Sequence, residues 1–227
     1  MRRDRIRLSI AAGLCVLVPL GCAKKTPEQA RETVEQIDGG TFEESMYRNK
    51  YLGFRLWIPP DWSIQDQQVQ KQITATGVQI VAGDNKNMQA VLRAGEAQTI
   101  NLLMAFKHPP GAPVAFNAVI ACVAAPVSHL PGIRTGGDYL FHTRRLLEAG
   151  QLKYSFPREV HVETVGGVEF YVMPTEIALS PQIVVEQYHY ATIRKGYALT
   201  LILSYATKED GSELHHMLET MAFAPLE

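Results

Sequence analysis

The stretch 184–205 constrains the fold more than any other part of the sequence. It has the pattern of two strands joined by Lys195-Gly196, a two-residue loop typical of a β-hairpin. The expected cross-strand pairs are Arg194 with Tyr197, Tyr190 with Leu201, and Tyr188 with Leu203. Both faces of this hairpin are mainly apolar or small, whereas a sheet with one face in water alternates apolar and polar residues. We therefore predict that the hairpin lies at the centre of a sheet with helices on both faces.

Strand-like patterns recur outside this hairpin. A strand is indicated by alternating apolar and polar residues, or by a short apolar run between turn residues. By this criterion we expect a strand hairpin over 47–58 and strands over 99–106, 114–126, 160–164 and 168–173. The last two should form a hairpin, because Gly166-Gly167 accepts the positive φ angles of a tight turn.

Helix formers fill much of the rest of the chain. They occupy 66–96, which Gly77 and the turn at 83–85 should divide into two helices. A further helix is expected over 139–149, with Asp138 as its N-cap. Ser212 is the expected N-cap of a closing helix, whose apolar stripe consists of Leu214, Met217, Leu218 and Met221.

This order of elements predicts the fold class and the domain organisation. Strands and helices do not alternate regularly, so a purely parallel sheet is not expected. We predict an α+β fold: an α/β/α sandwich with a mostly antiparallel central sheet. It should form a single domain over residues 46–227.

Residues 1–21 have the features of a bacterial lipoprotein signal peptide. Arginines precede an apolar run over 8–20, which is shorter than the roughly 20 residues of a membrane-spanning helix. The run ends in Leu20-Gly21-Cys22, which resembles a lipobox, the motif whose cysteine receives palmitate or another fatty acyl chain. Lipidation of Cys22 is therefore predicted. Ordinary secretion with an incidental Cys22 is the alternative, because Pro19 stands where a lipobox prefers leucine.

Residues 22–45 are expected to form a polar tether, with a possible short helix, between membrane and domain. Thr26-Pro27 suits the start of that helix, and Gly39-Gly40 suits its end. We expect the protein in the bacterial cell envelope, lipid-anchored, with its domain facing the periplasm. Ala23 stands where an aspartate would resemble an inner-membrane retention signal, which favours the outer membrane.

Charge and cysteine content narrow the range of partners. The chain has 22 basic and 23 acidic residues and a formal net charge of −1, so no strong field favours nucleic acid. Contact with the membrane should depend on the N-terminal lipid, and the expected further partner is a protein. Three cysteines cannot form a disulfide framework. Cys122 lies in an apolar run and should be a buried small hydrophobic residue.

Three blocks of the sequence resemble the PsbP-like superfamily, which includes DcrB-type bacterial envelope lipoproteins. The blocks are Tyr47-Arg48-Asn49 with Leu52-Gly53-Phe54 and Ile58-Pro59-Pro60-Asp61-Trp62, then 187–199, and then the closing helix with Met221-Ala222-Phe223. They frame residues 46–227, but the middle third matches only in the order of its elements. The resemblance implies an α/β/α sandwich and a largely non-catalytic protein that binds proteins or assists complexes. A fold alone does not transfer a function.

The sequence contains none of the common motifs for nucleotide binding, hydrolysis, zinc-protease or redox chemistry. His215-His216 would point about 100° apart on a helix, so two solvent-exposed histidines are expected rather than a metal pair. Glu186 and His189 would lie on opposite faces of a strand. No catalytic residue, metal site or cofactor is therefore predicted.

Two surfaces allow both a functional and a structural interpretation. The outer face of helix 139–149 would present an aromatic ring among charges: Phe141, Arg144, Arg145 and Glu148. It could bind an acidic partner or a lipid headgroup, or be a solvated face with an Arg–Glu pair. One sheet face would carry Tyr188, Tyr190, Tyr197 and Tyr205. They could line a cavity for a hydrophobic ligand, or form packed core. The structural interpretation is favoured in both cases.

The sequence thus leads to three functional hypotheses. The favoured one is a non-catalytic, lipid-anchored envelope protein that acts as a binding or assembly module. The alternative is a carrier of a small hydrophobic ligand, bound by the tyrosine face. A hydrolase is the third, and it would require His108, His129 or His161 to meet a carboxylate and a nucleophile in a cleft.

Overall fold

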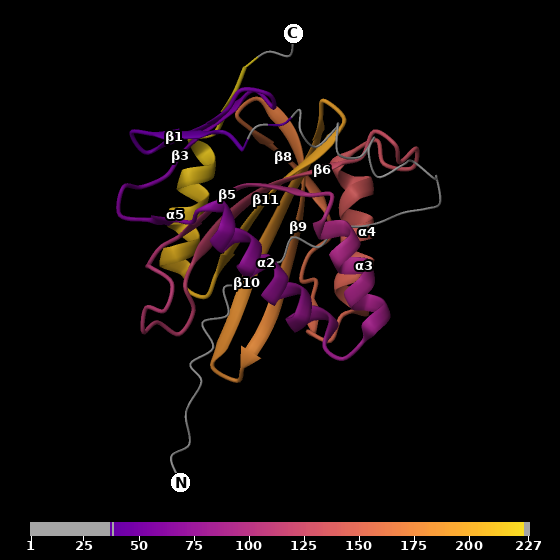
Figure 1. Ribbon diagram of the computed structural model, residues 1–227. Coiled ribbons are helices and arrows are strands. Elements are labelled where there is room, and N and C mark those ends of the chain that lie inside the picture. The colour runs from indigo at the N-terminus through magenta and orange to yellow at the C-terminus, as the bar shows by residue number, and fades with distance from the viewer. Residues whose placement is uncertain (1–36, 38, 225–227) are drawn as a thin grey trace.

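The computed structural model describes residue 37 and residues 39–224, which contain two antiparallel sheets and four helices (Figure 1). The helices are α2 (Gln67–Ala82), α3 (Lys86–Glu96), α4 (Gly136–Ala149) and α5 (Lys208–Glu219). The large sheet consists of β4 (Ser63–Ile64), β5 (Ile100–Phe106), β6 (Val119–Pro126), β11 (Tyr197–Tyr205), β10 (Ile183–Arg194), β9 (Val168–Ser180) and β7 (Tyr154–Ser155) in that spatial order, with β8 (His161–Val165) also paired to β9. The small sheet consists of β1 (Thr41–Glu43), β2 (Met46–Asn49), β3 (Phe54–Trp57) and β12 (Ala222–Phe223).

The predicted central hairpin is confirmed, together with its register. β10 and β11 lie in the middle of the large sheet, and the predicted cross-strand pairs all occur: Arg194 with Tyr197, Tyr190 with Leu201, and Tyr188 with Leu203. Lys195 and Gly196 take φ angles of 49° and 80°, which is the backbone geometry of a two-residue hairpin loop. The loop therefore fixes which side chains of the hairpin face each side of the sheet.

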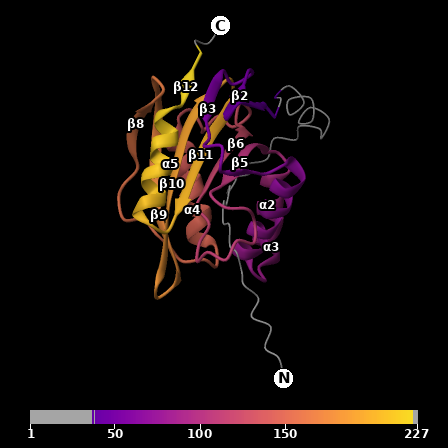
Figure 2. The ribbon, with the colours of Figure 1, turned by 90° about the vertical axis from the view of Figure 1, so that its left-hand side faces the viewer.

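Helices cover both faces of the large sheet, as the apolar hairpin predicts (Figure 2). On one face, α5 and the small sheet pack on β11, with Leu214 and Met217 in the same cluster as Leu201. On the other face, α2 and α4 pack on the sheet, and Leu140 shares a cluster with Ala191. Every strand pair in the described ranges is antiparallel. The predicted α+β fold with a mostly antiparallel sheet between helices is therefore confirmed.

Two helices begin earlier than predicted. The N-cap of α4 is Thr135 and not Asp138, because the Thr135 hydroxyl accepts from the Asp138 N–H at 3.1 Å while the Asp138 carboxylate accepts from the Thr135 N–H at 2.9 Å. This reciprocal pair is a capping box. The N-cap of α5 is Thr207 and not Ser212, and its hydroxyl accepts from the Asp210 N–H at 3.2 Å. Both predictions of the capping residue were wrong.

Two further boundaries also differ from the predictions. Gly77 does not divide 66–96, because it lies buried inside α2. The division into two helices comes at the predicted turn 83–85. The strand expected from residue 114 begins at Val119. The Asn117 side chain accepts from the His108 N–H at 3.0 Å and donates to the His108 carbonyl at 2.7 Å, and so holds the preceding segment in the β5–β6 loop.

The predicted signal peptide, Cys22 and the helix expected in the tether lie outside the described residues. The last part of the expected tether packs on the domain, because Ile37 is buried in the core and β1 pairs with β2. Cys122 is buried as predicted. None of the helices in the described ranges is both long enough and apolar enough to span a membrane.

Candidate functional site

The four tyrosines share one face of the sheet, as predicted, but they do not line an open cavity. Tyr190, Tyr197 and Tyr205 are only 1%, 2% and 6% exposed, and they belong to the core that α5 and the small sheet cover. Tyr188 is half-buried at the edge of this core, where its ring stacks on Tyr205 with 6.1 Å between centroids. The structural interpretation of this face is therefore the one that the packing supports.

One tyrosine takes part in a chain of polar contacts that sequence reasoning did not find. His161 Nε2 lies 2.8 Å from Glu163 Oε1, the Tyr190 hydroxyl donates to Glu163 Oε2 at 3.2 Å, and His215 Nδ1 lies 3.4 Å from that hydroxyl. The chain connects β8, β10 and α5. His215 is half-buried against the tyrosine rings, so its predicted solvent exposure was wrong, whereas His216 is exposed as predicted.

Within this series of polar contacts, the surroundings of His215 and Tyr190 favour their neutral forms. Burial lowers the pKa of His215, although Glu163 and Glu186 act in the opposite direction. Burial also raises the pKa of the Tyr190 phenol, and the Glu163 carboxylate raises it further. A neutral imidazole next to a phenol that resists ionisation supplies hydrogen bonds rather than a nucleophile. The contacts thus hold α5 on the sheet and do not amount to a hydrolytic site.

The other predicted chemistry-bearing residues also remain apart. Glu186 and His189 lie on opposite sides of β10, because the Tyr205 hydroxyl on one face donates to Glu186 at 3.2 Å while His189 is buried on the other. Within residues 39–224, no group of three histidine, cysteine or acidic side chains is placed to hold a metal ion. Of the three candidate histidines of the hydrolase hypothesis, His161 lies 2.8 Å from Glu163, and the hydroxyl that contacts the same carboxylate is the Tyr190 phenol.

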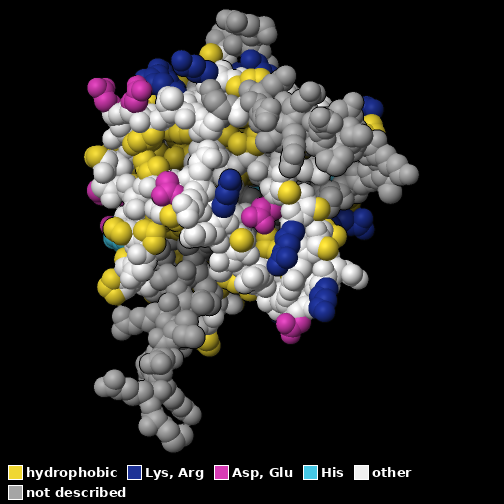
Figure 3. Space-filling view, in the orientation of Figure 1, with side chains coloured by type: hydrophobic (Ala, Val, Ile, Leu, Met, Phe, Trp, Pro, Cys, Tyr) yellow, Lys and Arg dark blue, Asp and Glu magenta, His cyan; other side chains and the backbone are white. Residues whose placement is uncertain are grey.

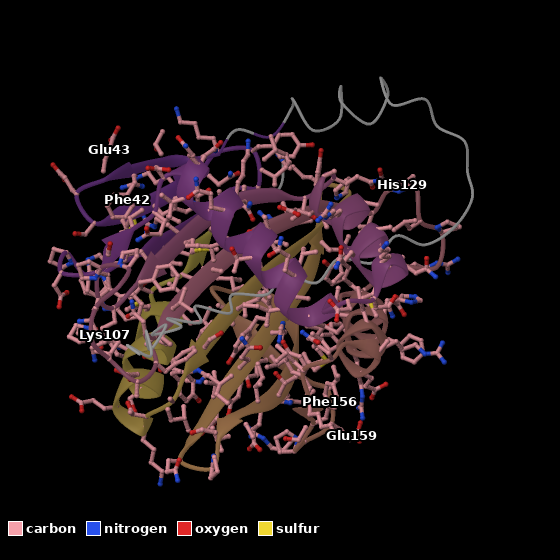
Figure 4. All side chains as sticks on the ribbon, turned by 60° about the horizontal axis from the view of Figure 1, so that its bottom comes forward. Phe42, Glu43, Lys107, His129, Phe156 and Glu159 are labelled. Atoms are coloured by element: carbon pink, nitrogen blue, oxygen red, sulfur yellow. The ribbon has the colours of Figure 1, made fainter. Side chains whose placement is uncertain are left out.

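The outer face of α4 has the ion pair of the structural interpretation. Arg144 pairs with Glu148 at 3.0 Å and lies over the Phe156 ring at 4.4 Å, and Phe156 and Glu159 lie close together beside it (Figure 4). Phe141 is 54% exposed, with Arg145 5.3 Å from its ring centroid. A single exposed ring of this kind is common on protein surfaces. It does not by itself indicate a binding site.

A separate network of ion pairs and hydrogen bonds holds α5 in place around Lys107, which Figure 4 labels. Lys107 Nζ lies 2.8 Å from both Asp210 and Glu213, and Trp62 Nε1 donates to Glu213 at 2.7 Å. Burial alone would raise the pKa of both carboxyl groups, but the hydrogen bonds with Lys107 hold them below their ordinary values. The network thus joins the β5–β6 loop and the β3–β4 connection to α5.

Lys107→Met is expected to lower stability at neutral pH by about 1 kcal/mol and to have little effect in acid. The folded-state pKa values of Asp210 and Glu213 lie below the ordinary 3.8 and 4.5. Their contribution is therefore full above those ordinary values, and it is lost as the pH falls through the lowered ones. Urea unfolding between about pH 3 and pH 7 measures this difference. Lys208→Met, on the exposed first turn of α5, should leave the acid dependence unchanged. Parallel pH profiles for Lys107→Met and the unsubstituted protein would contradict the assignment.

A groove of about 700 Å³ lies between α2, the end of α3 and the start of β5. Most of its lining surface is apolar, although polar side chains such as Gln67 and Gln72 from α2 and Asn101 from β5 contribute to it. Lys71 and Arg93 bring two positive charges, and Glu96 is the one carboxylate in the lining. Figure 3 shows basic side chains over α2 and α3 on this face. The groove therefore favours a ligand with negative charge.

The groove lies beside a strand edge that is largely open. β4 pairs with β5 only at Ala105 and Phe106, and the Gln65 N–H adds one bond to the Met104 carbonyl. No described strand pairs with the outer edge of 100–103. An unpaired edge offers N–H and C=O groups to an added strand. The same residues that line the groove, Ile100 and Asn101, lie on this open edge.

Sequence reasoning missed this groove. Its residues come from the flank of α2, the last turn of α3 and the first residues of β5, and each looks like an ordinary surface position in its own segment. Only the packing of α2 against α3 brings them together. The sequence offers one signal for the open edge. The segment between β3 and α2 is short, so it can supply only the two-residue strand β4 to pair with β5.

The sequence matches no protein-family model and no curated protein. Solved structures similar to this chain include the following two. The crystal structure of PA94, a protein of unknown function from Pseudomonas aeruginosa, has 13% identity and a TM-score of 0.39 over 76% of this chain and 92% of that chain. The solution structure of cyanobacterial PsbP from Synechocystis sp. PCC 6803 has 12% identity and a TM-score of 0.46 over 82% of this chain and 97% of that chain. Likeness at this level concerns the fold alone, so the function has to be argued from the residues of this chain.

Proposed function

We propose that this protein is a non-catalytic binding module of the bacterial cell envelope, anchored by lipid on Cys22, which binds an extended segment of a protein partner. The observation that carries the proposal is the groove of about 700 Å³ beside the open edge of β5. Strand addition at such an edge supplies main-chain hydrogen bonds, and adjacent pockets select side chains. The groove offers both features.

The charge of the groove indicates the kind of segment that it binds. The lining contains two basic side chains, Lys71 and Arg93, and one carboxylate, Glu96. Burial raises the pKa of Glu96, although Arg93 acts against this. Two basic side chains against one carboxyl group leave the lining with a positive formal charge. A partner segment with acidic side chains therefore complements the groove. Long-range steering plays little part, because the whole chain has a formal net charge of only −1.

The proposed anchor rests on the sequence of the first residues. A basic start, an apolar run over 8–20 and Gly21-Cys22 fit export followed by lipidation. A single fatty acyl chain binds membranes only marginally, and stable anchoring needs more than one. A lipoprotein anchor of several chains would hold the domain at the periplasmic face of a membrane. There it would meet envelope proteins at high local concentration.

Cys22→Ser is expected to release the protein from membranes into the soluble periplasmic fraction. The substitution removes the thiol that would carry the lipid, and leaves the described domain unaltered. Cys15→Ser is the matched control, because Cys15 lies within the proposed signal peptide and should not affect the anchor. Fractionation of cells with immunoblotting is the measurement. Membrane retention of Cys22→Ser equal to that of Cys15→Ser would contradict lipid anchoring at this position.

A photo-crosslinking residue at Gln72 is expected to capture a partner segment, whereas the same residue at Gln68 should not. Both glutamines are exposed on α2, but only Gln72 lines the groove. The crosslinked peptide, identified by mass spectrometry from intact cells, should be acidic and extended. Lys71→Glu should reduce its yield several-fold, and Lys86→Glu on α3, outside the groove, should not. Equal capture at both glutamines, or none at either, would count against the groove as the binding site.

A further inference from the structure

The small sheet carries two arginines directly opposite each other on its outer face. Its inner face packs on the core through residues such as Tyr47 and Leu56. On the outer face, Arg48 of β2 pairs with Arg55 of β3, and both side chains are exposed. Side chains in such a pair have Cβ atoms about 5 Å apart, so like charges repel. Lys50, exposed in the turn after β2, adds a third positive charge. We call Arg48, Lys50 and Arg55 the basic patch.

Nothing in the described domain offsets this repulsion. None of the ion pairs within residues 39–224 involves a member of the basic patch. The neighbours of the two arginines in the same row across the sheet are Thr41 and Ala222, which are uncharged. The carboxylates of this sheet, Glu43 and Glu44, lie at the β1–β2 turn, which is the end away from the β2–β3 turn. Figure 3 shows basic side chains over the small sheet, at the top of the molecule.

The same outer face carries a tryptophan. Trp57 lies two residues after Arg55 on β3, so both side chains project from one face, and Trp57 pairs there with Met46. Trp57 is half-buried, and no described residue accepts from its indole N–H, whereas Trp62 Nε1 donates to Glu213 at 2.7 Å. Tryptophan is typical of the boundary between water and membrane, because its ring is apolar and its N–H is polar. The face thus combines positive charge with an amphipathic ring.

The chain enters the described domain at this sheet. β1 is the first described strand, and it pairs with β2 beside Arg48. Cys22 lies 19 residues before Thr41, a length that can span about 60–70 Å when it is fully extended. A lipid on Cys22 would therefore keep the small sheet within this distance of the lipid headgroups. A weak contact with the membrane is then made often, because the effective concentration of a tethered surface is high.

We infer that the outer face of the small sheet docks on a membrane surface that contains anionic lipid headgroups. The guanidinium groups of Arg48 and Arg55 suit the phosphate oxygens of such headgroups, and a phosphate close to both offsets their mutual repulsion. Each basic residue near an anionic bilayer strengthens binding about fivefold. Trp57 would lie at the level of the headgroups. This surface is additional to the lipid anchor proposed for Cys22, and docking can fail while that anchor holds.

Docking through this face is compatible with the proposed binding of a protein segment. The groove beside β5 is lined by residues of α2, α3, β5 and the α3–β5 connection, and none of the lining residues belongs to the small sheet. The two surfaces therefore share no side chain. A variant of the basic patch should accordingly leave photo-crosslinking at Gln72 unchanged.

The test is tryptophan fluorescence of the full-length protein, purified from cells, on phosphatidylcholine vesicles with and without phosphatidylglycerol. The chain has two tryptophans, and Trp62 is only 5% exposed, so a brominated lipid should quench mainly Trp57. Quenching should be at least threefold greater with phosphatidylglycerol, and 1 M NaCl should remove the difference by screening the charges. Equal quenching on both kinds of vesicle, or none on either, would overturn the inference.

Co-sedimentation with phosphatidylcholine vesicles reports the lipid anchor separately. A protein that co-sediments with neutral vesicles, but shows no quenching that depends on phosphatidylglycerol, would refute docking and leave the anchor intact. A protein that shows this quenching, but does not co-sediment with neutral vesicles, would support docking and refute the anchor on Cys22.

Variants locate the docking on the proposed face. Arg48→Glu and Arg55→Glu should each lower the ratio of docked to undocked protein about fivefold or more. Arg145→Glu is the matched control, because Arg145 is an exposed arginine on α4. Trp57→Phe should remove the quenching that depends on phosphatidylglycerol, and Trp62→Phe should retain it. An effect of Arg145→Glu without an effect of Arg48→Glu would place the membrane contact on α4 and would refute the proposed face.

Arg55→Thr separates docking from a structural role of the arginine pair. Threonine suits a strand, and the substitution relieves the repulsion between Arg48 and Arg55. The urea midpoint measured without vesicles should therefore stay the same or rise, while the ratio of docked to undocked protein falls about fivefold or more. A lower midpoint would show that the pair stabilises the sheet, and would contradict its assignment to lipid headgroups.

Discussion

Arg194→Met is expected to lower the free energy of unfolding by about 3 kcal/mol. Arg194 is 6% exposed, and its guanidinium donates to the Leu52 carbonyl and, at 2.7 Å, to the Ala224 carbonyl. The same group lies 4.7 Å from the centroid of the Phe223 ring. It thus joins the end of β10 to the β2–β3 turn and to the last described strand. Methionine retains the apolar stem but leaves two carbonyl groups without their charged donor.

The size of this effect depends on the balance between the contacts of the guanidinium and the cost of burying its charge. Hydrogen bonds from a charged donor contribute about 1.5–3 kcal/mol each, and a stacked cation adds about 0.5–2 kcal/mol. Against this stands the cost of keeping a guanidinium out of water. Lys195→Met, at the exposed neighbouring position, is the matched control, because Lys195 only approaches the Tyr51 ring at 5.3 Å. Urea unfolding of both variants gives the comparison. A loss below about 1 kcal/mol for Arg194→Met would mean that burial of the charge cancels its contacts.

The central hairpin could be predicted because its determinants are local. A two-residue loop at Lys195-Gly196 fixes the register, and each strand then shows which side chains share a face. That both faces are apolar is visible in the sequence and implies coverage by helices. The burial of Arg194 could not be predicted in this way, because its partners, Leu52 and Ala224, lie far away in the chain.

The two misplaced helix starts have one physical cause. Thr135 and Thr207 each precede an aspartate by three residues, and in each pair the threonine hydroxyl accepts from the aspartate N–H. In α4 the pair is reciprocal and satisfies more of the exposed N–H groups than Asp138 alone would. In α5 the Thr207 hydroxyl also donates to the Asp210 carboxylate at 2.7 Å. A threonine three residues before an aspartate is visible in the sequence at both helix starts. The neighbouring glycines favoured a turn there and so hid the start of the helix.

The candidate site was harder to predict than the fold, because it is formed by tertiary packing. The groove beside β5 combines surface positions from α2, α3 and β5. Residue pattern gives the face of an element on which a side chain lies, but not which residues of other elements lie beside it.

Gly136→Ala is expected to destabilise the protein by about 3 kcal/mol or more. Gly136 is the first residue of α4, where the helix approaches β10. A Cβ atom at this position would lie 1.9 Å from the Ala191 carbonyl oxygen and 2.5 Å from its carbon. Both are backbone atoms of a central strand, so no side chain can rotate to make room. The start of α4 would have to move away from the sheet, which would loosen the packing of Leu140 on Ala191.

Gly132→Ala separates this steric effect from the general effect of replacing a glycine. A Cβ atom on Gly132 meets nothing within 4 Å, so the substitution should be neutral or stabilise by a few tenths of a kcal/mol through the unfolded chain. Thermal and urea unfolding of the two variants measure the contrast. If Gly136→Ala were as stable as Gly132→Ala, α4 would have to lie further from β10 than the contact with Ala191 requires. The close packing of α4 on β10 would then be wrong.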